Sequence, residues 1–136
     1  MQLTLVDQFE KTDKRRAIFL AAIEKQIGNF KYFRTLSRFN GMPDKTAPVL
    51  NNILNHLAQL ATLIDTSKPT GYYTDQTKDR VLLNVTESTD HEVIREYYHN
   101  GYIRLRGIFM ANKDLTKDHR PHIRSIILHC ENLITL

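Results

Sequence analysis

The stretch that decides the fold is Thr89–Ala111, TDHEVIREYYHNGYIRLRGIFMA. Its apolar residues recur at intervals of three and four, which places them along one face of an α-helix about six turns long. Gly101 lies within this face, where glycine costs about 1 kcal/mol relative to alanine, so it predicts the close approach of a second helix. Thr89 followed by Glu92 fits a capping box, and we expect Thr89 to cap the helix. The full stripe is Ile94, Tyr97, Tyr98, Gly101, Leu105, Ile108 and Phe109.

Two other segments show the same periodicity with clear boundaries. One begins near Thr46, carries Pro48 in its first turn and should end near Asp65. The last helix should follow Asp118 as N-cap, with Pro121 in its first turn. Their inward stripes are Leu50, Ile53, Leu54, Leu57, Leu60, Ala61 and Ile64 in the former, and Ile123, Ile126, Ile127, Cys130, Leu133 and Ile134 in the latter.

The first helix is predicted from about residue 8 to 27, and its phase breaks at Gly28–Asn29. A continued helix would place Arg34 on the apolar face and Phe39 on the opposite one. We therefore expect a break at this pair, followed by a short helical segment over 30–38.

These patterns predict one all-α domain over residues 1–136: a compact helical bundle of four main helices with a short extra helical segment after the first. The composition, 41% hydrophobic and 25% charged, is that of a globular protein. The apolar run 81–85 fits a helix or a strand, and a helix is preferred because no second strand is available for pairing. No run approaches the roughly 18 apolar residues of a membrane span, and the N-terminus lacks the order of a signal peptide, so we expect a cytoplasmic protein without a membrane partner.

The net charge of +4 is unevenly distributed along the chain. Residues 1–45 hold nine Lys and Arg against five Asp and Glu, residues 46–91 three against five, and residues 92–136 seven against five. The two ends are therefore basic and the middle is acidic. Such an asymmetry permits binding to a polyanion without requiring it.

The segment 29–41, NFKYFRTLSRFNG, interleaves cations with aromatic rings. Lys31, Arg34 and Arg38 are spaced by three and four, so they share one side of a helix, while Tyr32 and the phenylalanines lie between them. Cations in such a row can follow a phosphate backbone while neighbouring rings stack on bases. The alternative is that the rings fill the core and the cations form its solvated side.

A second row lies on the central helix, where Arg95, His99, Tyr102 and Arg106 are spaced by four, three and four. Arginine offers a planar fork of donors suited to phosphate, and histidine a charge that depends on pH. Alternatively, Glu92 and Glu96 pair with these arginines in an ordinary charged surface. Ile103 and Met110 project from the outer face of the same helix, which suggests a protein partner or self-association.

The sequence offers little for catalysis, a cofactor or a metal ion. Nucleotide loops, nucleophile elbows and zinc-finger spacings are missing. Cys130 lies on an apolar face, where an inert buried thiol is expected. Glu96-x-x-His99 matches only half of a di-iron element, and His119, His122 and His129 lack the further ligands of a tetrahedral set. We expect no cofactor and no metal.

Arg124-Ser-Ile-Ile-Leu-His129 resembles the Arg-x4-His element of the HEPN ribonucleases. The resemblance covers six residues and implies that Arg124 would stabilise charge on a scissile phosphodiester while His129 handles protons.

The leading hypothesis is a non-enzymatic regulatory binding protein that contacts nucleic acid through Lys31, Tyr32, Arg34, Arg38, Arg95, His99, Tyr102 and Arg106. The alternatives are a protein-interaction module, such as an inhibitor, adaptor or antitoxin-like partner, and a HEPN-like ribonuclease. The first hypothesis requires that the arginines of the two rows converge on one surface.

Overall fold

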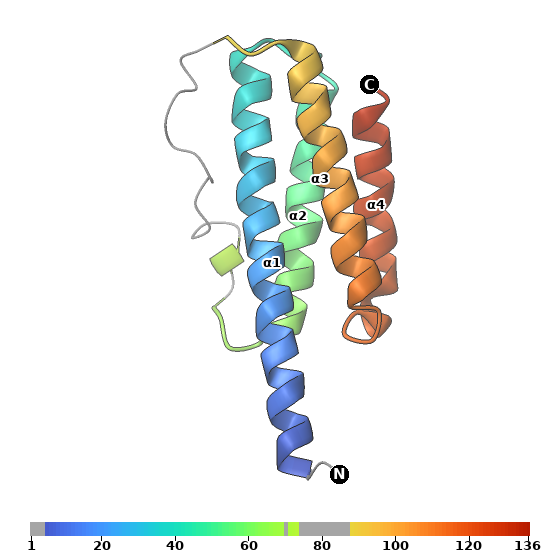
Figure 1. Ribbon diagram of the computed structural model, residues 1–136. Coiled ribbons are helices and arrows are strands. Elements are labelled where there is room, and N and C mark those ends of the chain that lie inside the picture. Colours follow the sequence, from blue (N-terminus) through green and yellow to red (C-terminus); the bar gives the residue numbers. More distant parts are fainter. Residues whose placement is uncertain (1–4, 70, 74–87) are drawn as a thin grey trace.

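The computed structural model describes residues 5–69, 71–73 and 88–136, with side chains described from residue 12 onward. Within these ranges the chain consists of helices joined by turns and has no strand, so the predicted four-helix architecture is confirmed (Figure 1). The run 81–85 lies outside the described residues. The elements are α1 (Leu5–Phe39), α2 (Thr46–Ile64), α3 (His91–Ala111), the short 3-10 turn η2 (Lys117–His119) and α4 (Arg120–Ile134).

The four helices form a ring in which α1 contacts α2 and α3, and α4 also contacts α2 and α3. Helices that are neighbours in this ring run antiparallel (Figure 1). The last residue of α2 and the first residue of α3 lie at opposite ends of the bundle (Figure 1). The α1–α2 edge is therefore opposite the α3–α4 edge. None of the helices in the described ranges is both long enough and apolar enough to cross a membrane.

The predicted apolar stripes meet at the centre of the ring. Most of their members are buried, including Leu57 of α2, Leu105 of α3 and Ile126 of α4, each with 0% exposure. Cys130 is also buried, and burial raises the pKa of its thiol to about 12, as an inert core thiol requires. The stripes thus form one continuous core.

The break predicted at Gly28–Asn29 is wrong, because α1 continues through this pair to Phe39. Arg34 faces α2, as a continuous helix requires. Its guanidinium donates a hydrogen bond to Asn51 Oδ1 of α2 at 3.0 Å, so the position between the two helices accommodates a cation. Phe39 is the last helical residue and is 51% exposed. The short additional helical turn is η2, before α4, and no separate segment follows α1.

Two of the expected caps are also wrong. Asp90, rather than Thr89, caps α3: its Oδ1 accepts a hydrogen bond from the Glu92 N–H at 3.0 Å. The Thr89 N–H instead donates to Asn40 Oδ1 at 2.7 Å, which ties the start of α3 to the end of α1. Asp118 lies within η2 and His119 occupies the N-cap position of α4, whereas the proline in the first turn is confirmed.

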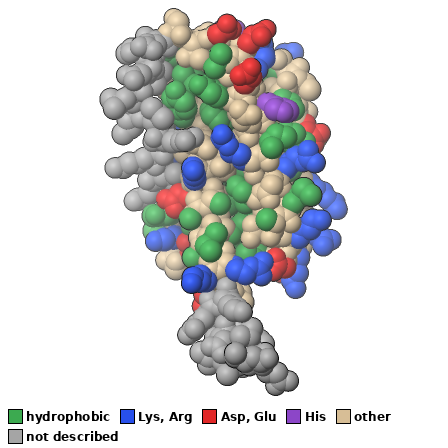
Figure 2. Space-filling view, viewed as in Figure 1, with side chains coloured by type: hydrophobic (Ala, Val, Ile, Leu, Met, Phe, Trp, Pro, Cys, Tyr) green, Lys and Arg blue, Asp and Glu red, His purple; other side chains and the backbone are tan. Residues whose placement is uncertain are grey.

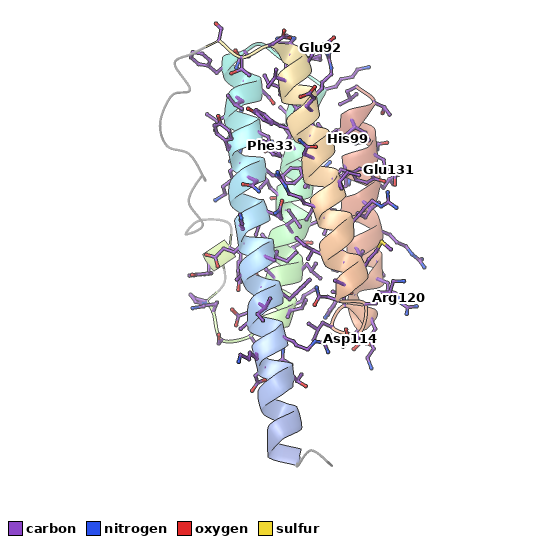
Figure 3. All side chains as sticks on the ribbon, in the orientation of Figure 1. Phe33, Glu92, His99, Asp114, Arg120 and Glu131 are labelled. Carbon is purple, nitrogen blue, oxygen red and sulfur yellow. The ribbon has the colours of Figure 1, made fainter. Side chains whose placement is uncertain are left out.

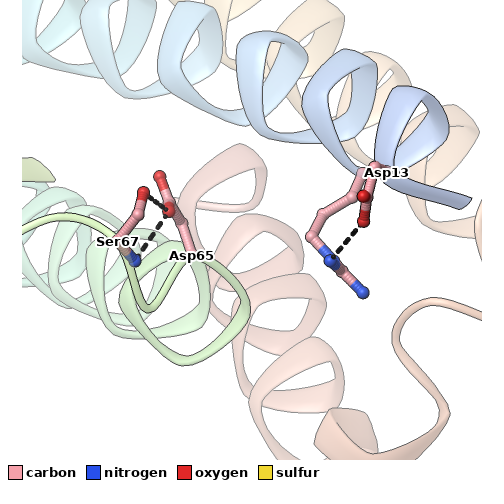
Figure 4. A network of polar contacts seen from close by, with 4 residues as sticks. Asp13, Asp65 and Ser67 are labelled. Atoms are coloured by element: carbon pink, nitrogen blue, oxygen red, sulfur yellow. Dashed lines mark hydrogen bonds and ion pairs between the residues drawn. The ribbon is translucent and has the colours of Figure 1, made fainter. Parts of the chain in front are cut away.

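The boundary after α2 agrees with the prediction, since the helix ends at Ile64 with Asp65 as its C-cap. The Asp65 carboxylate then organises the turn. Its Oδ1 accepts hydrogen bonds from the Ser67 N–H at 3.1 Å and the Ser67 hydroxyl at 2.5 Å (Figure 4). Its Oδ2 accepts one from the buried Tyr73 hydroxyl at 2.7 Å. These bonds hold the pKa of Asp65 below its usual value.

The close helix approach predicted at Gly101 is confirmed. A Cβ atom at this position would lie 2.9 Å from Cζ of Phe30 and 3.0 Å from Cε2 of Phe33, both on α1. The two rings are buried and contact each other edge to face. A methyl group at this position would therefore force a shift of buried core side chains, which favours glycine.

Gly101→Ala is expected to destabilise the fold by about 1–3 kcal/mol, because the added methyl group overpacks the contact with Phe30. Gly107→Ala is the matched control, since a Cβ atom there meets nothing within 4 Å. The control should stabilise α3 by up to about 1 kcal/mol through helix propensity alone. Urea denaturation followed by circular dichroism measures both changes. Equal effects of the two variants would contradict the close approach.

Candidate functional site

In the segment 29–41, the first of the two rows, the aromatic rings and the cations have different environments. Phe30 and Phe33 are buried in the core, and Tyr32 is half-buried against it. Arg34 faces α2, and the exposed Arg38 lies near the turn that joins α1 to α2. Base stacking on the two phenylalanines is therefore not available.

The second row lies on α3, and its last member, Arg106, also lines a groove between α3 and α4. The guanidinium of Arg106 sits over the half-buried ring of Tyr102, 5.4 Å from its centroid. The ring of His99 is 6.5 Å from that of Tyr102. Arg95 lines a shallow hollow on α3 together with Glu92, Glu96, His99 and Asn100.

Arg106 of the second row is not brought together with Arg34 and Arg38 of the first. Arg34 and Arg38 belong to the α1–α2 edge, whereas Arg106 lines a groove between α3 and α4 on the opposite edge. Lys31 and Tyr32 also belong to α1. Arg106 therefore does not share one surface with Arg34 and Arg38, and the two edges are described separately.

The α3–α4 edge carries the groove with the most distinctive chemistry. Its cavity volume is about 510 Å³. The apolar floor is formed by the buried Phe109 and by Ile123 and Ile127, which pack against the core; Met110, 62% exposed, stands beside it. We call this the α3–α4 groove; its lining residues are Arg106, Phe109, Met110, Lys113, Thr116, Arg120, Ile123, Arg124 and Ile127.

Four exposed cations rim the α3–α4 groove: Arg106 and Lys113 from α3 and the turn after it, and Arg120 and Arg124 from α4. In the described part of the chain, none of the four forms an ion pair with a carboxylate. Lys and Arg side chains gather over α3 and α4 in Figure 2. Arg120 lies at the end of the bundle where α3 turns into α4 (Figure 3).

A carboxylate close to the groove in sequence, Asp114, is held by a different helix. Arg15 of α1 pairs with it at 2.7 Å, and this hydrogen-bonded pair lowers the pKa of Asp114. A second ion pair joins Arg16 to Asp13 on α1 (Figure 4). Among the residues that the structure describes, no carboxylate therefore pairs with the cations of the groove.

Sequence reasoning missed the groove as a unit. It singled out Arg106 and Met110 for separate reasons, and Arg124 only for its distance from His129. The spacing of Arg120 and Arg124 by one helical turn, each followed three residues later by an isoleucine, was a local signal of a basic row beside an apolar one.

Arg124 and His129 lie on different flanks of α4. Arg124 lines the α3–α4 groove, whereas the ring of His129 stacks on that of His56 of α2, with centroids 5.6 Å apart. The two side chains that the HEPN resemblance pairs therefore do not face a common position in this chain.

A cluster of three imidazoles occupies the α2–α4 edge. His56 lies between His129 and His122, whose ring centroid is 5.9 Å away. The Nδ1 atom of His56 is buried and lacks a hydrogen-bond partner. Burial, and then the charges of His129 and His122, lower the pKa of His56. Across the described residues, no three His, Cys, Asp or Glu side chains are placed to hold a metal ion.

The free energy of unfolding is expected to fall as pH is lowered below about 6.5 toward 5. The pKa of His56 in the folded state is lowered from 6.5, so the unfolded chain binds the proton more readily and gains stability in acid. His56→Gln should flatten this pH dependence, because it removes the buried imidazole. Urea denaturation at a series of pH values between 5 and 8 measures the free energy of unfolding, and the same pH dependence in the wild type and in His56→Gln would contradict the assignment.

Comparison with known proteins adds no assignment: no family model, curated protein or solved structure matches this chain.

Proposed function

We propose that this protein is a non-enzymatic binding module that accepts an acidic segment of a partner protein in the α3–α4 groove. The observation that carries the proposal is the combination of an apolar floor with a rim of four cations that have no carboxylate partner in the described residues. This revises the emphasis of the sequence hypotheses, in which nucleic acid came first and a protein partner second.

The apolar floor favours a protein partner. Covering apolar surface contributes about 25 cal/mol per Å², so Met110 and the isoleucines offer binding energy that a phosphate backbone would not use. Exposed ion pairs contribute only about 0–1 kcal/mol each. The cations therefore supply rapid association and selection of an acidic partner rather than most of the affinity.

Nucleic acid remains a second candidate, and a specific observation favours it. Within the described ranges, Arg95 and Arg106 form no ion pair with Glu92 or Glu96, so both guanidinium groups are open to a ligand phosphate. Together with His99 and Tyr102, these arginines could extend a phosphate contact along α3. Under this candidate, Lys31, Tyr32, Arg34 and Arg38 would make a separate contact at the opposite edge.

Selection from a library of random 16-residue peptides displayed on phage tests the proposal. The wild-type protein should enrich sequences that combine Asp and Glu with large apolar residues. Enrichment should be lost with Arg120→Ala/Arg124→Ala, which removes one side of the rim. Arg38→Ala/Lys45→Ala is the matched control, since it removes the same charge from exposed positions near the α1–α2 turn and should select the same peptides.

A salt series with a short DNA duplex and a short single-stranded RNA separates the two candidates. If the partner is a protein, the selected peptides should retain measurable affinity at about 500 mM salt. Salt at this concentration screens the contacts between charges but does not weaken the apolar contact. Nucleic acid that binds more tightly than any selected peptide at 150 mM salt would contradict the proposal, as would the absence of enrichment.

A further inference from the structure

We propose that the segment bound in the α3–α4 groove is an amphipathic α-helix of about three turns, with one apolar stripe and carboxylates on both sides of it. This inference rests on the proposed function and specifies the chemistry and conformation of the partner.

The backbone of the ligand decides between a helix and an extended strand. The walls of the groove are two α-helices, α3 and α4, whose backbone groups are already paired within each helix. An extended peptide would find no sheet edge there with which to pair its own N–H and C=O groups. A helix satisfies these groups internally and can bring a continuous apolar face to the floor.

The dimensions of the groove set the length of the helix. On α4 the lining residues run from Arg120 to Ile127, seven residues apart, which is about 10 Å along the helix axis. On α3 they begin at Arg106 and continue past Met110 to the turn. A ligand helix of about 8–11 residues covers this length, and its axis would lie about 8–10 Å from those of its neighbours.

The positions of the charges set the sequence pattern of the ligand. Arg106 and Lys113 come from α3 and the turn after it, whereas Arg120 and Arg124 come from α4, so both walls of the groove contribute cations. The ligand therefore needs apolar residues at i, i+3, i+4 and i+7, with Asp or Glu flanking the stripe on both sides. A second copy of this chain is a poor occupant, because it would bring another basic edge toward the groove.

Two synthetic 16-residue peptides of identical Leu, Glu, Ala and Gln composition test the inference. One places leucine at the helical interval with glutamate on both flanks, and the other alternates leucine and glutamate as in a strand. Titration calorimetry should show that the helical arrangement binds at least about tenfold more tightly, a difference of about 1.4 kcal/mol. Circular dichroism should show a gain of helix on binding.

Variants of the protein locate the contact. Met110→Asp should weaken binding of the helical peptide by about tenfold or more, since it places a like charge and a polar group beside the floor. Leu63→Asp is the matched control, because Leu63 is 48% exposed on α2 and does not line the groove. Both substituted side chains are exposed, so the fold should tolerate either change.

Each outcome has a distinct meaning. Equal binding of the two peptides, or tighter binding of the alternating one, overturns the helical inference and leaves the proposed function standing. Failure of both peptides together with failure of the phage selection overturns the proposed function as well. A wild-type protein that sediments as a dimer and becomes monomeric in Met110→Asp also overturns the inference, because a second copy then occupies the groove.

Discussion

The contact of Gly101 with the rings of Phe30 and Phe33 fixes how α3 is rotated in the bundle. The face of α3 that carries Gly101 packs against α1. Arg106 is five residues further along, about 140° around the helix from Gly101, and it therefore lies on the side that faces α4. Leu105 and Phe109 then point into the core. The position of the α3–α4 groove is therefore a consequence of where one glycine is placed.

The charge of the groove depends on residues outside it. Arg15 of α1 holds Asp114 at the turn after α3, so this carboxylate is paired away from the rim. The opposite flank of α4 faces α2, which contains no Asp, Glu, Lys or Arg between Thr46 and Ile64. Histidines fill that edge instead. The bundle thus combines a basic α3–α4 edge with an α2–α4 edge at which three imidazole rings contact one another.

Features that depend on the periodicity within one helix were predicted correctly from the sequence. Features that depend on a particular residue of another helix were not. The apolar stripes, the proline positions and the approach at Gly101 were correctly predicted because burial imposes them on each helix separately. The break at Gly28–Asn29 was wrong because Asn51, on another helix, accommodates Arg34. The groove could not be predicted, since it requires the adjacency of α3 and α4 and an ion pair between residues 99 positions apart.

The central claim is that the cations of the α3–α4 groove act as one surface toward an acidic ligand. Nuclear magnetic resonance of the arginine Nε–H groups during titration with the helical acidic peptide tests it most directly. The signals of Arg106, Arg120 and Arg124 should shift together with one binding constant, while that of Arg38 stays in place. Shifts that begin at Arg38, or that follow different binding constants for the three groove arginines, would contradict the account.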